Sequence, residues 1–138
     1  MPRAILDPNV LVSAAITHDG LPARLLTEFR DGSFELIVSP RLLRELRDVL
    51  GRDKFRRYVT VEEAEAFVET LITGATVRPD PHTTNPPLPS DPDDQYLVDL
   101  LVATQVDALV TGDAALLDLR EILPVMSPAE FMLTLAEV

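Results

Sequence analysis

Two aspartates each stand just behind an apolar run that has the composition of a buried strand. Asp7 directly follows residues 3–6 (RAIL), and Asp113 follows residues 108–111 (ALVT) after a single glycine. Burying an unpaired carboxylate is costly, so each acid needs a partner. If the two strands are neighbours in a parallel sheet, both carboxylates face one crevice at its edge, where they repel each other unless a cation lies between them. The pair therefore indicates a metal site.

A third acid, Glu45, lies on a clearly marked helix. Residues 39–51 (SPRLLRELRDVLG) begin with Ser39 as N-cap and Pro40 in the first helical position, and they end on glycine. The apolar stripe of this helix consists of Leu42, Leu43, Leu46, Val49 and Leu50. At about 100° per residue, Glu45 falls just outside the stripe, from where its carboxylate can reach along the sheet edge. The alternative is an ordinary surface glutamate.

Acids also open the segment 90–97 (SDPDDQYL). Asp91 fits an N-cap and Pro92 the first helical position, and Asp93 and Asp94 then fall in the first turn, where the helix dipole favours negative charge. Capping alone explains these residues without any chemistry. The same dipole also keeps the carboxylate of Asp94 ionised, as a metal ligand must be, so the two interpretations are compatible.

Two polar residues stand close to the same strand ends. Asn9 comes two residues after Asp7, and Thr111 comes two residues before Asp113. Each could orient a carboxylate or hold a water beside the metal. Each could equally serve the turn, with asparagine as a helix cap in particular. As candidate site residues, both receive a supporting role.

The elements that must position these residues alternate between strand and helix. Strands are predicted in residues 3–6, 34–38, 75–77, 107–113 and 122–127, and helices in residues 22–32, 39–51, 60–74, 93–106, 114–119 and 128–138. This alternation is typical of a parallel sheet with helices on both faces. Six prolines exclude regular structure from residues 78–92. Because only about 46 residues follow this loop, we expect one domain over residues 1–138.

The composition is that of a soluble globular protein. No apolar stretch approaches the roughly 20 residues of a membrane span. The chain contains no cysteine, which excludes disulfides, thiolate nucleophiles and sulfur-ligated metals. The start of the sequence lacks the layout of a signal peptide, so we expect a cytoplasmic protein without a membrane partner.

The net charge of −11 argues against nonspecific attraction to nucleic acid. The distribution of the basic residues points the other way. Seven of the twelve lie in one stretch, as Arg41, Arg44, Arg47, Arg52, Lys54, Arg56 and Arg57. They form either a solvated helix face or a stripe that docks a polyanion. The second interpretation makes them candidate RNA-binding residues.

Several motifs together resemble those of PIN-domain ribonucleases. They are ILDPNVLVSA, VSPRLLRELRDVLGRDKFRRYVT, DPDDQYLVDL and DALVTGDAALL, in this order and at matching spacings. The likeness runs over almost the whole chain, and it is strongest to the VapC-like toxins of toxin–antitoxin systems. It implies a three-layer α/β/α fold with a parallel sheet of about five strands in the order 3-2-1-4-5.

The resemblance also implies a catalytic metal site. Carried over by motif, its acids are Asp7, Glu45, Asp94 and Asp113. They would bind Mg²⁺ or Mn²⁺, and a metal-activated water would hydrolyse RNA phosphodiester bonds. Asp91 and Asp93 remain alternatives to Asp94, which is preferred because its spacing to the following YLV sequence fits best.

A toxin of this type implies certain partners. They are an RNA substrate, a cognate antitoxin protein that inhibits the enzyme, and a second copy of the chain in a homodimer. Helices between residues 41 and 74 are the candidate surface for the protein contacts. The competing interpretation is a catalytically inactive PIN-like module that binds or scaffolds other molecules.

Overall fold

A parallel sheet forms the centre of the structure, a computed structural model that describes residues 1–82 and 91–137. Its strands are β1 (Arg3–Leu6), β2 (Glu35–Val38), β3 (Thr76–Val77), β4 (Ala108–Val110) and β5 (Val125–Met126). They lie in the order β3-β2-β1-β4-β5, and every pairing is parallel. The expected strand order 3-2-1-4-5 is confirmed.

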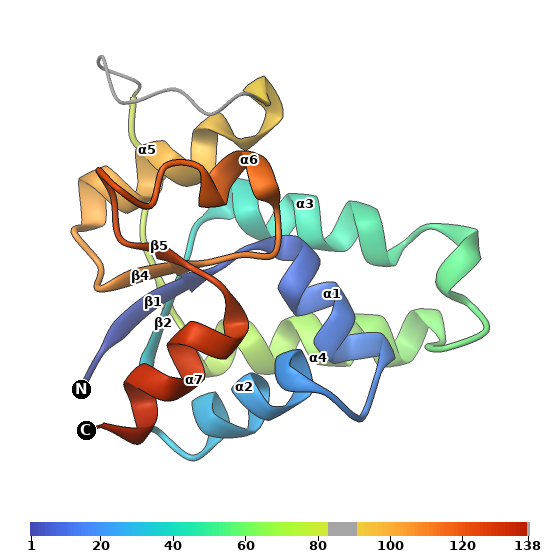
Figure 1. Ribbon diagram of the computed structural model, residues 1–138. Coiled ribbons are helices and arrows are strands. Elements are labelled where there is room, and N and C mark those ends of the chain that lie inside the picture. Colours follow the sequence, from blue (N-terminus) through green and yellow to red (C-terminus); the bar gives the residue numbers. More distant parts are fainter. Residues whose placement is uncertain (83–90, 138) are drawn as a thin grey trace.

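Helices cover both faces of this sheet. The α-helices are α1 (Pro8–Ile16), α2 (Leu21–Arg30), α3 (Pro40–Leu50), α4 (Val61–Gly74), α5 (Gln95–Thr104), α6 (Ala114–Leu117) and α7 (Pro128–Ala136), and two short 3₁₀ helices are η1 (Asp53–Phe55) and η2 (Pro92–Asp94). Figure 1 shows α5 on one side of the sheet and α1, α2, α4 and α7 on the other. The predicted three-layer α/β/α architecture is confirmed. None of the helices within the described residues has the length and apolar character that crossing a bilayer requires.

The core lies between these layers and is built mainly from aliphatic strand residues. Ile5, Ile37 and Leu109, from the three central strands, are fully buried. Phe34 and Phe131 are also buried, and their rings meet edge to face with 5.1 Å between centroids. Since Phe131 belongs to α7, this contact attaches the last helix to the sheet.

Local signals set the start of several helices where the sequence predicts it. The hydroxyl of Ser39 accepts a backbone hydrogen bond at 3.2 Å in the first turn of α3. Thr60 with Glu63 and Ser127 with Glu130 complete capping boxes at the starts of α4 and α7. The whole predicted apolar stripe of α3 is buried.

The structure differs from the sequence prediction in several elements. The short helix η1 is not predicted, and β4 and β5 are shorter than the strands predicted over 107–113 and 122–127. No element is predicted for residues 8–16, which form α1, with the Asp7 side chain as N-cap and Pro8 in the first turn. The single helix predicted over 93–106 is instead η2 followed by α5, which ends at Thr104 because Gln105 adopts a left-handed φ of 51°. Residues 83–90, most of the predicted proline-rich loop, lie outside the described residues.

Candidate metal centre

Asp7 and Thr111 directly follow the ends of two neighbouring strands, β1 and β4. Strands β1 and β4 are neighbours, with Leu6 opposite Val110. The pairing continues one step further, because the N–H of Asp7 donates to the carbonyl of Val110 at 2.9 Å. The sequence predicts that Asp7 and Asp113 lie close together if their strands are neighbours, and β1 and β4 are neighbours. Both acids therefore follow the carboxyl ends of adjacent strands, where α/β sheets bind ligands.

Asp7 is a buried carboxylate held by two hydrogen bonds, and only 4% of it is exposed. Its Oδ1 accepts from the backbone N–H of Asn9 at 3.0 Å, and its Oδ2 accepts from the hydroxyl of Thr111 at 2.7 Å. Burial raises the pKa of Asp7, these hydrogen bonds lower it, and the nearby charges of Asp113 and Glu45 raise it again, with a net upward shift. A cation bound beside Asp7 would favour its ionised form and so oppose this upward shift.

Thr111 connects the two acids at the strand ends. Its hydroxyl donates to Asp7 and accepts from the backbone N–H of Asp113 at 3.0 Å. Asp113 in turn caps α6, with Oδ1 accepting from the N–H of Ala115 at 3.0 Å. Since Thr111 is fully buried, this relay fixes the position of one carboxylate relative to the other.

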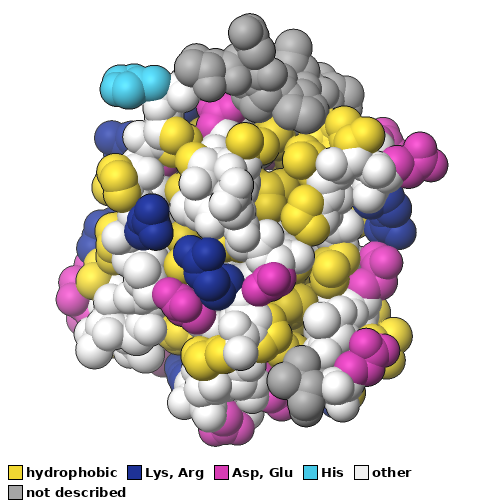
Figure 2. Space-filling view, turned by 90° about the vertical axis from the view of Figure 1, so that its left-hand side faces the viewer, with side chains coloured by type: hydrophobic (Ala, Val, Ile, Leu, Met, Phe, Trp, Pro, Cys, Tyr) yellow, Lys and Arg dark blue, Asp and Glu magenta, His cyan; other side chains and the backbone are white. Residues whose placement is uncertain are grey.

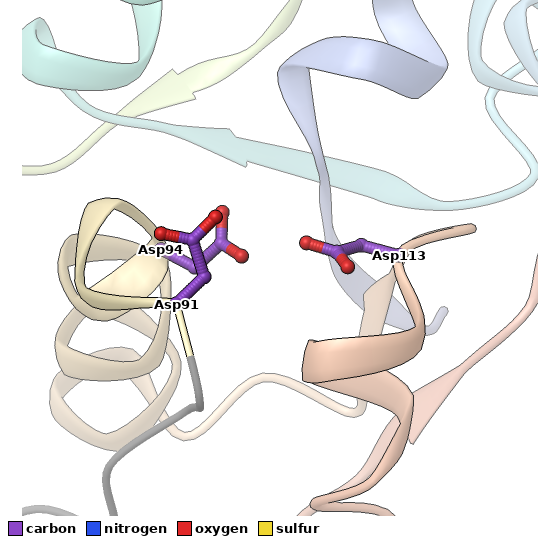
Figure 3. Close-up of side chains that lie close together, drawn as sticks. All are labelled: Asp91, Asp94 and Asp113. Carbon is purple, nitrogen blue, oxygen red and sulfur yellow. The ribbon is translucent and has the colours of Figure 1, made fainter.

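Asp91, Asp94 and Asp113 form the tightest group of carboxylates among the described residues. One oxygen of each lies within 4.8 Å of the others. Figure 3 shows Asp91 and Asp94 reaching from η2 and its N-cap toward Asp113, which reaches back from the start of α6. We refer to Asp7, Asp91, Asp94 and Asp113 together as the acidic centre.

Asp94 carries the strongest electrostatic signature of the acidic centre. Burial, contact with the carboxyl group of Asp113 and the charges of Asp7 and Asp91 raise the pKa of Asp94 to about 8. The expectation that the helix dipole keeps this carboxylate ionised is therefore wrong for the metal-free protein at neutral pH, because burial and the neighbouring acids outweigh the dipole. Its Oδ2 is buried and has no hydrogen-bond partner among the described residues. An orphaned carboxylate oxygen aimed at other carboxylates is the arrangement that a bound cation satisfies.

The remaining predicted acid, Glu45, borders the acidic centre from α3. Its side chain is exposed, and it lies outside the group of oxygens within 4.8 Å, as does Asp7. The charge of Glu45 nevertheless acts on both Asp7 and Tyr96, so its carboxylate lies in their electrostatic range. Glu45 lies beside the buried apolar stripe of α3, as the helical periodicity predicts.

The structure also separates the acids that the sequence leaves as alternatives. Asp91, the N-cap of η2, lies with Asp94 in the tight group, whereas Asp93 is exposed and outside it. The spacing of three residues between Asp91 and Asp94 is the signal for this, because residues i and i+3 share one side of a helical turn. Asn9 contributes only its backbone N–H to Asp7, and its side chain is exposed.

The seven basic residues are spread over separate places. Arg41 lies at the start of α3, with its guanidinium 4.6 Å from the centre of the Tyr96 ring. Arg47 faces α4 and pairs with Glu69 at 3.8 Å. Arg52, Lys54, Arg56 and Arg57 lie in or beside η1, at the far end of α3 from the sheet (Figure 1). Arg44 is exposed on α3 between Arg41 and Arg47. The seven basic residues thus belong to two places, α3 and the segment around η1.

The face of the molecule at the left of Figure 1 also carries mixed charges. In Figure 2, Lys and Arg side chains on this face are interspersed with acidic and hydrophobic ones. On this face, no single charge predominates over the described residues.

The donor set of the acidic centre fits a hard divalent cation. Every candidate ligand atom is a carboxylate oxygen, and the chain has no cysteine. Mg²⁺ and Mn²⁺ prefer oxygen ligands, and Mg²⁺ takes only a few carboxylates while keeping several waters. Asp94 Oδ2 supplies a buried ligand atom without another partner among the residues that are described.

Known proteins resemble this chain, one in sequence and two in fold. An uncharacterized protein, MJ1680 from Methanocaldococcus jannaschii, is 26% identical over 119 residues, which cover 86% of this chain and 76% of that protein. The crystal structure of PAE2754 from Pyrobaculum aerophilum superposes with a TM-score of 0.69 at 14% identity, covering 99% of this chain and 91% of that one. VapBC2 from Rickettsia felis, bound to a DNA fragment from its promoter, gives a TM-score of 0.56 at 13% identity, covering 91% of this chain and 96% of that one.

At these identities the two solved structures show the fold alone. Family membership rests on the sequence itself, because the family described as PIN domain matches residues 3–115, from β1 through the beginning of α6. The matched region contains every residue of the acidic centre. The chain belongs to the PIN domain family.

Proposed function

We propose that the protein is a metal-dependent endoribonuclease and that it is the toxin of a toxin–antitoxin pair. One observation carries the proposal: carboxylates from distant parts of the chain converge at the carboxyl end of the sheet, where Asp94 has a buried, unpartnered oxygen. Carboxylates that lie this close together repel one another and destabilise a protein unless a cation is bound between them. Membership of the PIN domain family supports nuclease chemistry for that cation.

Within this proposal, Asp94 and Asp113 would hold the ion together with Asp7, and Asp91 and Glu45 would complete its surroundings. Mg²⁺ or Mn²⁺ bound there would supply an activated water and offset negative charge on the phosphate. The protein contributes a fixed frame, since Thr111 holds Asp7 and Asp113 in register. Asp7 is largely screened from solvent, which strengthens its electrostatic interactions at the centre.

The charge of the chain supports metal-dependent rather than constitutive RNA binding. At a formal net charge of −11, the protein repels a polyanion at long range. The acidic centre adds to this repulsion until its charge is neutralised. The carboxylates of the acidic centre would therefore accept a phosphate nearby only when a divalent ion neutralises their charge. Chelators should abolish both RNA binding at the acidic centre and cleavage.

Cleavage of labelled RNA by the purified protein tests the proposal. Single-stranded and structured RNAs are incubated with Mg²⁺, Mn²⁺ or excess chelator, and we expect cleavage in the metal conditions only. Asp113→Asn and Asp94→Asn should abolish it. Asp118→Asn is the matched control, because it removes an exposed carboxylate at the end of α6, outside the acidic centre.

Two results would contradict the nuclease proposal. Cleavage that persists in excess chelator, or in Asp113→Asn, would show that the acidic centre is not the active site. Intact RNA in every condition, with the protein folded, would favour the inactive binding module instead.

We further propose an antitoxin partner and place it in a groove of about 440 Å³ between α1, α2 and α4. The similarity to VapBC2 supports a partner of this kind. The lining of the groove combines apolar side chains such as Phe67 with charged ones, Arg30 and Glu63, and Tyr58 in this lining is 54% exposed. A groove with mixed apolar and charged lining suits an amphipathic helix of a partner.

Expression of the wild-type chain should arrest cell growth, and Asp113→Asn should not. A small protein encoded beside this chain should relieve the arrest and co-purify with it. Ala66→Arg fills the groove and should prevent that binding while leaving RNA cleavage intact, whereas Ala129→Arg on the exposed side of α7 should change neither. Equal binding of the partner by both variants would show that it binds outside the groove.

We also propose that the protein forms a homodimer. Sedimentation of the purified chain tests this, and the mass of a single chain would contradict it.

A further inference from the structure

We infer that Arg41 binds a phosphate of the RNA beside the acidic centre and that Tyr96 holds its guanidinium in place for that purpose. The inference rests on the proposed nuclease function. It singles out one of the seven basic residues of the 41–57 segment and gives it a specific task.

Arg41 is located at the acidic centre by the fold. It occupies the first turn of α3, which starts directly after the carboxyl end of β2. Its backbone N–H donates to Oδ2 of Asp80 at 2.9 Å, and this contact fixes the start of the helix. Glu45 lies four residues further on the same helix face, so Arg41 and Glu45 point to the same side of α3.

Tyr96 is the surface on which the guanidinium rests. The ring belongs to the first turn of α5, is 7% exposed, and lies 4.6 Å from the guanidinium carbon of Arg41. This distance is within the range of a cation–π contact. Burial raises the pKa of the Tyr96 hydroxyl, the charges of Glu45, Asp7 and Asp94 raise it further, and Arg41 opposes them. Both the arginine and the acids therefore lie within electrostatic range of the Tyr96 hydroxyl.

The edge of this guanidinium is free to bind a ligand. Across residues 1–82 and 91–137, the Arg41 side chain makes no hydrogen bond and no ion pair. Two other arginines of the segment are engaged, because Arg47 pairs with Glu69 and Arg56 donates to the carbonyl of Leu50. Arg57 also lies over an aromatic ring, that of Tyr58, but it is located beside η1 at the other end of α3. A planar guanidinium that is stacked on one face and has free N–H groups at its edge is preorganised for bidentate contact with a phosphate.

The charges around Arg41 explain why one cation at this position matters. The acidic centre attracts a metal ion but repels the phosphates on either side of the one that the ion contacts. Arg41 is the basic residue whose charge acts on Tyr96 alongside those of Asp7, Glu45 and Asp94. The η1 residues lie at the other end of α3, whose 11 residues extend over roughly 16 Å. Arg41 therefore offsets the repulsion between the acidic centre and the RNA phosphates. The basic residues in or beside η1 are further from the acidic centre and offset this repulsion less.

Equilibrium binding of a short, fluorescently labelled single-stranded RNA tests the inference. Anisotropy is measured in Ca²⁺ over a series of salt concentrations, and cleavage in Mg²⁺ and Mn²⁺ is followed separately. Arg41→Gln should weaken binding on the order of tenfold, as expected for one charge-assisted contact. It should also lower the slope of log Kd against log salt by about 0.7, the value for one contact to a single strand.

Two further variants separate stacking from charge. Arg41→Lys keeps the charge but not the planar fork, so we expect it to retain the salt slope and lose several-fold in affinity. Tyr96→Leu removes the stacking surface, and it should weaken binding in the wild-type background but not in Arg41→Gln. Arg24→Gln is the control, because Arg24 is an exposed residue of α2 outside the acidic centre, and Kd should change less than about twofold.

The outcomes separate this inference from the proposed function. If the wild type cleaves RNA but Arg41→Gln and Arg24→Gln show the same affinity and salt slope, the role of Arg41 is refuted and the nuclease stands. If Arg41→Gln alone flattens the salt slope but no metal supports cleavage, the phosphate contact stands and the nuclease does not. If the wild type binds no RNA, both are refuted. Because Arg41 is exposed and loses only its contact with the Tyr96 ring, Arg41→Gln should melt within about 3 °C of the wild type.

Discussion

Replacing Thr111 by valine tests whether the acidic centre depends on the hydroxyl that links Asp7 to Asp113. Valine has nearly the same shape, and residue 111 is fully buried, so the change removes the hydroxyl and little else. Asp7 Oδ2 then loses a 2.7 Å hydrogen bond, and the N–H of Asp113 loses a 3.0 Å one. Leaving a buried charged acceptor and a backbone donor unsatisfied costs about 3 kcal/mol. For a chain of this length, that corresponds to a fall in Tm of about 10 °C.

Thermal unfolding in chelator measures this loss, and titration calorimetry with Mn²⁺ measures its effect on metal binding. The hydrogen bond from Thr111 lowers the pKa of Asp7, so Thr111→Val should raise that pKa and weaken metal binding near neutral pH. Thr111→Ser is the matched control, because it keeps the hydroxyl and removes only a methyl group, at a cost of about 1 kcal/mol. The reasoning is refuted if valine and serine give the same Tm and the same metal affinity.

Other predictions concern charge and packing. The pKa of Asp94 is raised from 3.8 to about 8, so the folded chain binds more protons than the unfolded one in that window. Its stability without metal should therefore fall as pH rises from 4 to 8 in urea unfolding, and added Mg²⁺ should stabilise it more at pH 8 than at pH 5. Above pH 8, where Asp94 is largely ionised, Asp94→Asn relieves this repulsion, so it should raise the Tm in chelator while removing the stabilisation by Mg²⁺. A fall in Tm at that pH like that of a cavity mutant would contradict the crowding argument. Phe131→Ala empties a buried site against Phe34 and should cost about 3–5 kcal/mol in urea unfolding, with Leu133→Ala on the exposed side of α7 as a control expected to cost little.

The sequence by itself determines much of the local structure. Ser39 and Thr60 mark helix starts because a cap needs only a side-chain oxygen and the N–H groups two or three residues further on. The stripe from Leu42 to Leu50 predicts the buried face of α3 because helical periodicity is a local property. Acids placed at the ends of two apolar strands also predict a shared crevice, on the condition that the strands are neighbours.

Tertiary structure decides whether that condition is met. The contact between Thr111 and Asp7 joins residues 104 positions apart, and no local pattern specifies it. The same holds for the stacking of Arg41 on Tyr96 and for the approach of Asp91 and Asp94 to Asp113. It also holds for the basic residues, which a continuous run of sequence groups together but which the turn after α3 carries to different places. Contacts of this kind depend on how separate helices and strands pack, and packing is fixed only when the whole core of the chain is assembled.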